Sequence, residues 1–327
     1  MRSSVMKTPR CATTRTRNLV LALCCLLVGS GANGQDRPLL SDQLVGREFS
    51  YTVQPGDSLT AIGARFGVSS SVLASRNSLA LNARLKIAQE LKVDNRHIVP
   101  RSIDEGIVIN LPQRMLFFLK AGQALRAYPV GLGKQDWPTP SGRFKIAVKE
   151  ENPVWDVPKS IQEEMRREGK VVQTGVPPGP DNPLGKHWLG LSIGGYGING
   201  TIAPSSIYQF QTHGCIRLHP DDVAELFAAV ERGTPVLLLY RRLLLARIGA
   251  RIFLEVHRDI YGKQAGVERE LRQLVENENL AARVDWRLAE DIIRRQQGIA
   301  REITKENLPT LDHEAAGAHS RPPLPKQ

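Results

Sequence analysis

Short apolar runs and turn residues mark a first organised unit near residue 50. Residues 35–49 form a polar lead-in without a sustained period, and residues 51–53 are strand-like. A Pro-Gly-Asp turn then leads to a stretch over 58–66 with apolar positions three and four residues apart, which is helical spacing. A second short helix is predicted over 69–76. We therefore expect a strand, two helices and a last strand near 90–93.

From residue 107 the periodicity changes from helical to strand-like. Apolar runs bounded by Gly and Pro predict strands at 107–110, 115–120, 125–130, 143–148, 189–193 and 236–240. A helix is predicted over 160–168, and a proline-dense loop follows over 176–183. A long loop of this kind before a strand favours the wall of a binding site.

The last part of the chain, over 241–306, combines a hairpin with two amphipathic helices. The hairpin is predicted from 243–245 and 251–256, around Gly249. Each helix is marked by apolar residues on one face: Val267, Leu271, Leu274 and Val275 in the first, and Leu288, Ile292, Ile299 and Ile303 in the second. The polar, Pro-rich composition of 307–327 predicts a disordered tail.

The beginning of the chain has the order of a secretory signal. Basic residues precede an apolar run over 19–28, and small residues follow up to Gly34. We predict a signal peptide over 1–34, export to the periplasm, and no membrane span after cleavage. An uncleaved membrane anchor is the alternative interpretation.

Length and charge restrict the classes of function. A chain of 327 residues with 41% apolar content can bury a large domain with an accessory one, or two moderate domains. The net charge of +11 falls to +6 without the five basic residues of the predicted signal. The remaining basic residues are spread, without interleaved aromatics, so no nucleic-acid partner is expected. A modestly basic exported protein suits an anionic envelope, and solubility explains the charge equally well.

Cysteine usage isolates one thiol. Three of the four cysteines lie in the predicted signal, so Cys215 alone remains in the mature chain. A solitary thiol in an oxidising compartment is either a buried small hydrophobe or a reactive group, and the count does not decide between them.

The neighbours of Cys215 favour a nucleophile. His213 stands two residues earlier, so in an extended backbone both side chains project to the same side. Gly214 clears the approach of a carbonyl, and the backbone N–H groups of Gly214 and Cys215 are candidate oxyanion donors. Arg217, two residues further on, is a candidate for binding a substrate carboxylate in a bidentate pair.

The first unit resembles a LysM module through three strings of residues. These are 51–59, 62–68 and Asn77. The resemblance implies a βααβ fold over 50–98 that binds N-acetylglucosamine-containing glycan in a shallow groove. The segment 79–90 departs from the family, which has a short proline-containing turn there. A packing module without glycan affinity is the alternative.

The central region resembles the L,D-transpeptidase family, also called the YkuD domain. The strings that carry this resemblance include 137–142, 152–155, 197–201, 204–207 and 212–218. The resemblance implies a mainly-β catalytic fold over 105–240. The fold class expected for the whole chain is therefore α+β, with the LysM module and a C-terminal helical extension.

The same resemblance implies a reaction and its partners. Cys215 attacks the peptide bond between diaminopimelate and D-alanine of a peptidoglycan donor stem, and the thioester passes to an amine of another stem or of an envelope protein. Thr212, Gly200 and Thr201 join Arg217 as expected substrate-binding positions. The histidines lack metal-ligand spacing. We therefore expect no metal and no cofactor.

One position departs from the family pattern. The family usually has a histidine sixteen residues before the nucleophile, and this chain has Asn199. An amide cannot accept a proton near neutral pH, although it can orient an imidazole. Either His213 is the base, or the partner that lowers the pKa of the cysteine, with Asn199 orienting it, or the enzyme is slow or inactive. Hydrolysis of the same acyl-enzyme and a wall-binding pseudoenzyme are the alternative functions.

Overall fold

The computed structural model describes residues 39–305 of the chain. The predicted signal peptide (1–34) and the predicted tail (307–327) lie outside the described residues. Within 39–305, no helix is long and apolar enough to cross a membrane.

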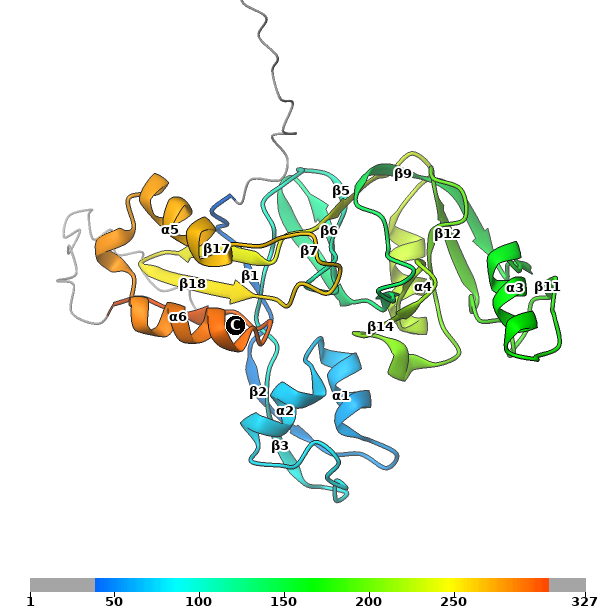
Figure 1. Cartoon of the computed structure of the whole chain (residues 1–327), viewed down its shortest axis with the longest axis horizontal. Helices are drawn as coiled ribbons and strands as arrows, with labels where there is room; N and C mark the ends of the chain where they lie inside the picture. Colours follow the sequence, from blue (N-terminus) through cyan, green and yellow to red (C-terminus); the bar gives the residue numbers. More distant parts are fainter. Residues whose placement is uncertain (1–38, 306–327) are drawn as a thin grey trace, which may run out of the picture. The chain divides into compact units, whose positions relative to one another are not determined.

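The first unit has the predicted order of strand, helix, helix, strand (Figure 1). Its elements are β2 (Glu48–Thr52), α1 (Leu59–Phe66), α2 (Ser70–Arg76) and β3 (Glu90–Asp94). The Ser58 hydroxyl caps α1 by accepting the Ala61 N–H at 3.1 Å, and Gly67 ends the helix with a φ of 71°. Both signals are local, which is why the sequence predicted this helix well.

The first strand of this βααβ unit begins earlier than predicted. β2 starts at Glu48, so the prediction of a polar lead-in up to residue 49 is wrong at its end. Only one face of β2 is covered: Phe49 and Tyr51 pack edge-on against Phe66, at ring distances of 5.1 and 5.2 Å. Polar residues alternate with these aromatics, and this half-exposed pattern hid the strand.

The central region forms an eight-stranded mixed sheet. In sheet order its strands are β15 (Ile216–Arg217), β13 (Gly197–Asn199), β12 (His187–Leu191), β9 (Gly142–Glu151), β16 (Pro235–Leu239), β5 (Gly106–Asn110), β6 (Met115–Lys120) and β7 (Gln123–Pro129). The long strand β9 pairs with β16 through its first half and with β12 through its second half. All six predicted strands are confirmed, β6 with the predicted ends and the other five with shifted ends.

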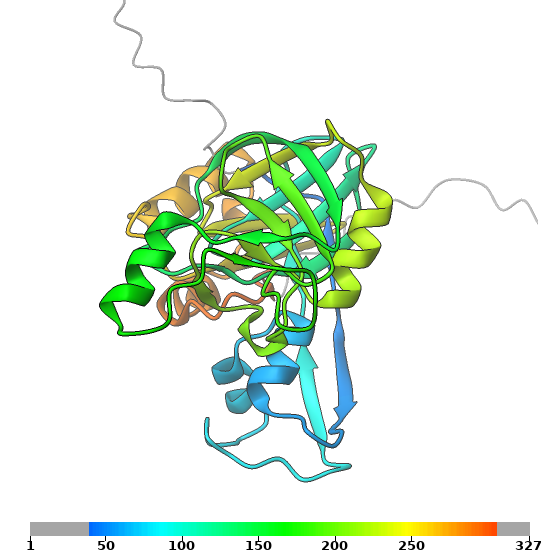
Figure 2. The same cartoon turned by 90° about the vertical axis from the view of Figure 1, so that its right-hand side faces the viewer.

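Two helices belong to this region. α3 (Lys159–Arg167) confirms the predicted helix, and none of its residues is buried. α4 (Pro220–Ala229) was not predicted; it buries Val223 and Leu226 and contacts β12, as Figure 2 shows beside the sheet. Its sequence does carry a helix start signal, a proline at the first helical position followed by two acidic residues.

The C-terminal part contains the predicted hairpin, β17 (Leu243–Ile248) and β18 (Arg251–Val256), and two helices. Figure 1 shows α5 (Val267–Asn277) and α6 (Trp286–Arg295) beside this hairpin. The prediction that Ile299 and Ile303 extend the second helix is wrong. Gln296 adopts a left-handed conformation with a φ of 48°, and the chain returns as β19 (Arg301–Glu302) to pair with β18.

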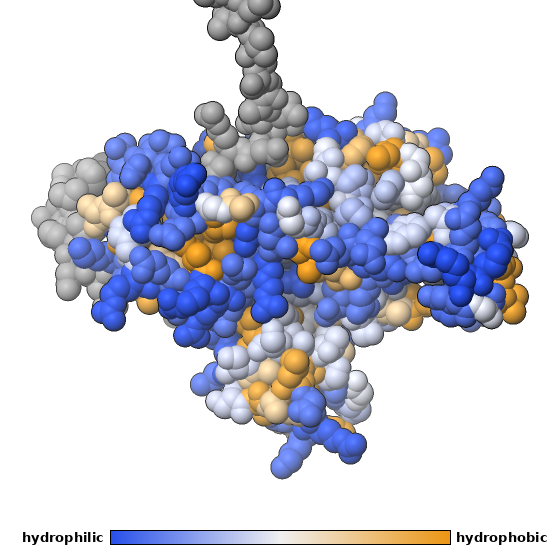
Figure 3. All heavy atoms as spheres, viewed as in Figure 1, coloured by the Kyte–Doolittle hydropathy of each residue, from blue (hydrophilic) through white to orange (hydrophobic). Residues whose placement is uncertain are grey.

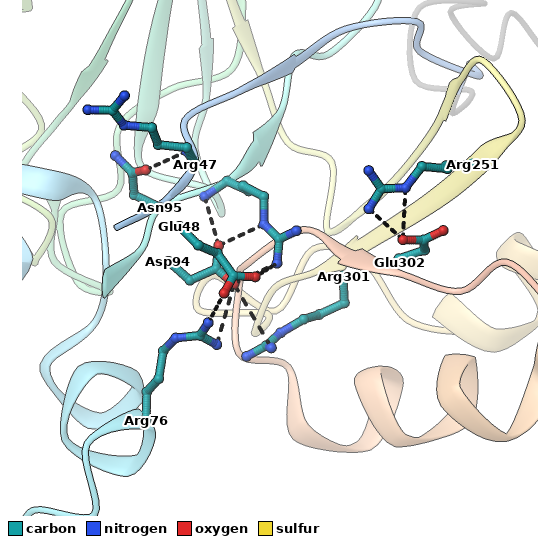
Figure 4. A network of polar contacts seen from close by, with 9 residues as sticks. Arg47, Glu48, Arg76, Asp94, Asn95, Arg251, Arg301 and Glu302 are labelled. Atoms are coloured by element: carbon teal, nitrogen blue, oxygen red, sulfur yellow. Dashed lines mark hydrogen bonds and ion pairs between the residues drawn. The ribbon is translucent and has the colours of Figure 1, made fainter. Parts of the chain in front are cut away.

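This return segment joins the C-terminal part to the first unit. Ile299 is 1% exposed and belongs to the hydrophobic core of the first unit. Figure 4 shows the polar side of the same contact, where Arg76 and Arg301 approach the buried Asp94 carboxylate at 3.6 and 4.0 Å. Arg96 pairs with the same carboxylate at 2.9 Å. The first unit is therefore packed against the C-terminal part.

A second buried carboxylate, Glu255 on β18, joins three segments of the chain. It accepts the Ile98 N–H at 2.6 Å and the Gln113 side-chain amide at 3.0 Å. The rings of His97 and His257 lie 2.7 and 2.9 Å from the same carboxylate. Since the other nitrogen of His97 faces the Gly67 carbonyl at 2.8 Å, this cluster also reaches the end of α1.

We expect Glu255→Gln to lower the free energy of unfolding by about 3 kcal/mol, because an amide cannot replace all the hydrogen bonds that this buried carboxylate makes, and buried polar groups would be left unsatisfied. Burial alone would raise the pKa of Glu255, but the His97 and His257 rings bring it to about 2. A depressed pKa stabilises the fold above the unfolded-state value of about 4.3 and loses that contribution as the pH falls toward 2. Urea unfolding from pH 7 to pH 3 measures both effects. If the free energy of unfolding changed with pH in the same way in wild type and variant, the expectation would be wrong.

Candidate active site

Cys215 lies in a tight turn between β14 (Phe210–Thr212) and β15. The Thr212 hydroxyl closes this turn: it accepts the Gly214 N–H at 3.1 Å and donates to the Cys215 carbonyl at 2.6 Å. Gly214 has a φ of +105°, and a Cβ there would lie 2.6 Å from the Tyr196 ring. Only glycine fits this position, because any side chain would be strained and would clash.

A loop over 133–139 forms hydrogen bonds with the turn that contains Cys215. The Thr139 hydroxyl donates to the Gly214 carbonyl at 2.9 Å and accepts the Gly133 N–H at 3.0 Å. The Lys134 N–H donates to the Thr212 carbonyl at 2.9 Å. The turn that contains Cys215 is therefore hydrogen-bonded at both ends to one neighbouring loop.

The turn opens into a pocket of about 720 Å³. Residues from several segments line it, including Cys215, His213, Asn199 and Arg217 from the motif region, Ile161, Glu164 and Met165 from α3, and Trp155, Leu184 and Trp188. The outward face of α3 is strongly hydrophilic, as Figure 3 shows. Pro183, at the end of the predicted proline-dense loop, also lines the pocket, so the end of this loop contributes to the wall.

The environment of Cys215 favours the neutral thiol. Burial raises its pKa, while the Gly197 backbone N–H and the Arg217 charge act in the opposite direction and do not outweigh burial. Its Sγ lies 3.8 Å from the Gly195 carbonyl oxygen. His213 does not contribute to the pKa of Cys215, so the prediction of His213 as a pKa-lowering partner is not supported by this geometry.

His213 is instead held by residues outside the motif. Its Nε2 is hydrogen-bonded to the Glu164 carboxylate, and the Trp137 ring packs edge-on at 4.9 Å. The Lys134 ammonium donates to the other Glu164 oxygen at 2.9 Å, and Lys134 together with His213 lowers the pKa of Glu164. An ionised carboxylate on one ring nitrogen fixes the orientation of an imidazole.

Asn199 does not orient that imidazole. Its side-chain amide donates to the Gly200 carbonyl at 2.6 Å, and its Oδ1 has no hydrogen-bond partner within residues 39–305. The side chain is 1% exposed. Asn199 pairs in register with Arg217 across β13 and β15, so both side chains lie on the same face of the sheet.

Comparison with known proteins identifies the family to which the central region belongs. The model of the YkuD L,D-transpeptidase catalytic domain matches residues 104–238, and the LysM domain model matches residues 51–94. The probable L,D-transpeptidase YcfS of Escherichia coli is 31% identical over 221 residues, which is 66% of this chain and 69% of that protein. This chain belongs to the L,D-transpeptidase family. It is an enzyme of that class with an α+β fold and a LysM domain, as predicted.

Further L,D-transpeptidases show similar relationships. The putative L,D-transpeptidase YkuD of Bacillus subtilis is 30% identical over 188 residues, which is 58% of this chain and 97% of that protein. Among solved structures, the catalytic domain of the Enterococcus faecium L,D-transpeptidase acylated by ertapenem is 26% identical. It covers 42% of this chain and 97% of that one, with a TM-score of 0.33.

Several of the predicted site residues of this L,D-transpeptidase are buried or hydrogen-bonded within the protein. The Gly214 N–H is not free for an oxyanion, because the Thr212 hydroxyl accepts it, and the same hydrogen bonds occupy Thr212 itself. Gly200 and Thr201 are buried and do not line the pocket; the Thr201 hydroxyl accepts the Ala203 N–H at 3.0 Å. Thr212 lines the pocket, whereas Gly200 and Thr201 do not, and the oxyanion and substrate-binding roles of these residues stay predictions.

Two predicted groups keep the geometry that their roles require. The Cys215 backbone N–H has no acceptor within the described part of the chain. Arg217 lines the pocket beside the thiol, with its guanidinium 3.4 Å from the Ser206 hydroxyl. Burial lowers the pKa of Arg217, and interaction with Cys215 opposes that change.

Glu164 is the site residue that the sequence did not reveal. It lies 49 residues before His213, in the helix predicted over 160–168, none of whose residues is buried. No short motif links the two positions, so folding alone brings them together.

Proposed function

We propose that this L,D-transpeptidase is exported to the periplasm and acts on peptidoglycan there. The LysM domain is the glycan-binding part, and it keeps the catalytic pocket near stem peptides by raising their local concentration. The acceptor is an amine of a second stem or of an envelope protein.

The reaction proposed for the pocket has two steps. The Cys215 sulfur attacks the carbonyl between diaminopimelate and D-alanine, a C–S bond forms, and the C–N bond breaks to release D-alanine. The thiol proton passes to a base and then to the leaving amine. The acceptor amine next attacks the thioester and regenerates the thiol. The single observation that carries this proposal is that Cys215, His213 and Arg217 line one pocket.

We assign the base to His213, held by Glu164. If Nε2–H donates to the Glu164 carboxylate, Nδ1 is left as the proton acceptor, which is the logic of a carboxylate-oriented imidazole. A thiol whose pKa is raised by partial burial needs such a base at the moment of attack. The free Cys215 N–H is the proposed oxyanion donor, and Arg217 is proposed to bind a carboxylate of the donor stem.

Purified protein incubated with a disaccharide-tetrapeptide tests this function. We expect a crosslinked dimer, released D-alanine, and a transient covalent adduct on the peptide that contains Cys215, all measured by mass spectrometry. D-alanine release without dimer, in the presence of excess acceptor amine, would instead indicate a hydrolase. Binding to glycan without any product would indicate the pseudoenzyme that Asn199 suggested.

A further inference from the structure

A tyrosine from the C-terminal part reaches the loop that supports the nucleophile turn. The Tyr261 hydroxyl donates to the Gly133 carbonyl at 2.7 Å and accepts the Thr139 N–H at 3.4 Å. Tyr261 lies beyond residue 238, where the match to the catalytic-domain model ends. This contact therefore comes from a segment outside the matched catalytic domain.

Tyr261 is itself held in place on several sides. Its backbone N–H donates to the Tyr240 hydroxyl at 3.0 Å, and that hydroxyl donates to the Asp259 carboxylate at 2.6 Å. The Tyr261 ring stacks on Tyr240 and meets Phe210 edge-on, each at 5.7 Å between ring centroids. Asp259 also accepts the backbone N–H groups of Lys263 and Gln264, each at 2.9 Å. The hydroxyl is therefore presented to the loop from a fixed support.

The loop that Tyr261 contacts serves both proposed catalytic groups. Thr139 hydrogen-bonds the Gly214 carbonyl, next to Cys215, at 2.9 Å. On the other side, Trp137 packs on the His213 ring, and Lys134 bonds to Glu164. The loop is tightly folded, since a Cβ at Gly133 would lie 2.1 Å from the Trp137 carbonyl oxygen. A shift of this loop would move the thiol and the imidazole relative to each other.

We propose that Tyr261 is a positioning residue for the active site, and that the C-terminal part completes the catalytic apparatus through it. Tyr261 touches no reacting atom in this proposal. It fixes the loop over 133–139, and the loop fixes the distance between Cys215 and His213. The proposal rests on the proposed role of Cys215 as the nucleophile.

The test compares Tyr261→Phe with Thr304→Val in the full chain. Tyr261→Phe keeps the ring packing and removes only the hydroxyl. Thr304→Val is a matched control in the same C-terminal part, because its hydroxyl also accepts one N–H and donates one hydrogen bond, each at 2.9 Å. We expect kcat of Tyr261→Phe to fall about 10-fold with KM unchanged, since small displacements of catalytic groups are costly. Thr304→Val should keep wild-type kcat, and both variants should show similar thermal midpoints.

An assay that needs no substrate separates this proposal from the proposed function. The alkylation rate of Cys215 by iodoacetamide, followed by mass spectrometry of its peptide across pH, should change its pH profile in Tyr261→Phe and not in Thr304→Val. If wild type makes no product but the profile still shifts, the proposed function fails and the positioning role stands. Unchanged kcat and an unchanged profile in Tyr261→Phe would overturn the positioning role.

Discussion

Cys215→Ala is expected to abolish both D-alanine release and dimer formation, with rates lower by about 10,000-fold or more, because removal of a covalent nucleophile leaves only binding and oxyanion stabilisation. The turn that the Thr212 hydroxyl closes holds Cys215 in the lining of the pocket. The described residues offer no second thiol to replace it. Mass spectrometry of products after incubation with the disaccharide-tetrapeptide measures the loss.

The control for this prediction is that the variant still folds and still binds glycan. The alanine variant should keep the thermal midpoint and the glycan affinity of the wild type, because no residue of the LysM domain lines the pocket that contains Cys215. In the wild type, the alkylation rate of Cys215 should still be rising at pH 9, since burial raises the pKa of this thiol. Products from the alanine variant at the wild-type rate would disprove nucleophilic catalysis by Cys215.

The elements that the sequence predicted are those whose signals are local. The helix at α1 has its cap Ser58, its apolar face and its terminal Gly67 within ten residues. The strand β5 is buried at all five positions, so its continuous apolar run needed no knowledge of its neighbours. The strands that carry the site, β13, β14 and β15, have only two or three residues each, which is too short for any periodic signal.

The second C-terminal helix shows the limit of periodicity. Ile299 and Ile303 continue the helical spacing of Leu288 and Ile292, yet they are buried for other reasons. Ile299 enters the core of the LysM-containing unit, and Ile303 packs in the core around β17 and β18. Apolar spacing alone does not reveal whether two residues face the same core.

The residues of the candidate site also divide into those with a local sequence signal and those without one. Cys215, His213 and Arg217 lie within five residues, and their chemistry could be predicted from that spacing. Glu164 and Tyr261 reach the same site from distant segments, so no local pattern could have found them. The role expected for Asn199 required a contact with His213, and the fold gives its amide to the Gly200 carbonyl instead.

His213→Gln is expected to lower turnover by about 100 to 10,000-fold, which is the usual loss for a general base. Glutamine keeps a polar side chain near Glu164 but accepts no proton near neutral pH. Glu164→Gln should reduce turnover less, because the imidazole remains and loses only the carboxylate that orients it. If the two residues act as one unit, the double variant should be no slower than His213→Gln alone. Steady-state release of D-alanine measures all three.

Asn199→His tests the opposite possibility, that the base belongs at position 199. The Asn199 side chain shares the face of Arg217 and has an unpaired Oδ1, so an imidazole there would enter the pocket wall at the family's usual base position. With His213 as the base, this variant should change turnover little in the wild-type background, and it should restore activity in part to His213→Gln. A large gain in the wild-type background would show that the native chain lacks an effective base. That result would move the base from position 213 to position 199 and leave Cys215 as the nucleophile.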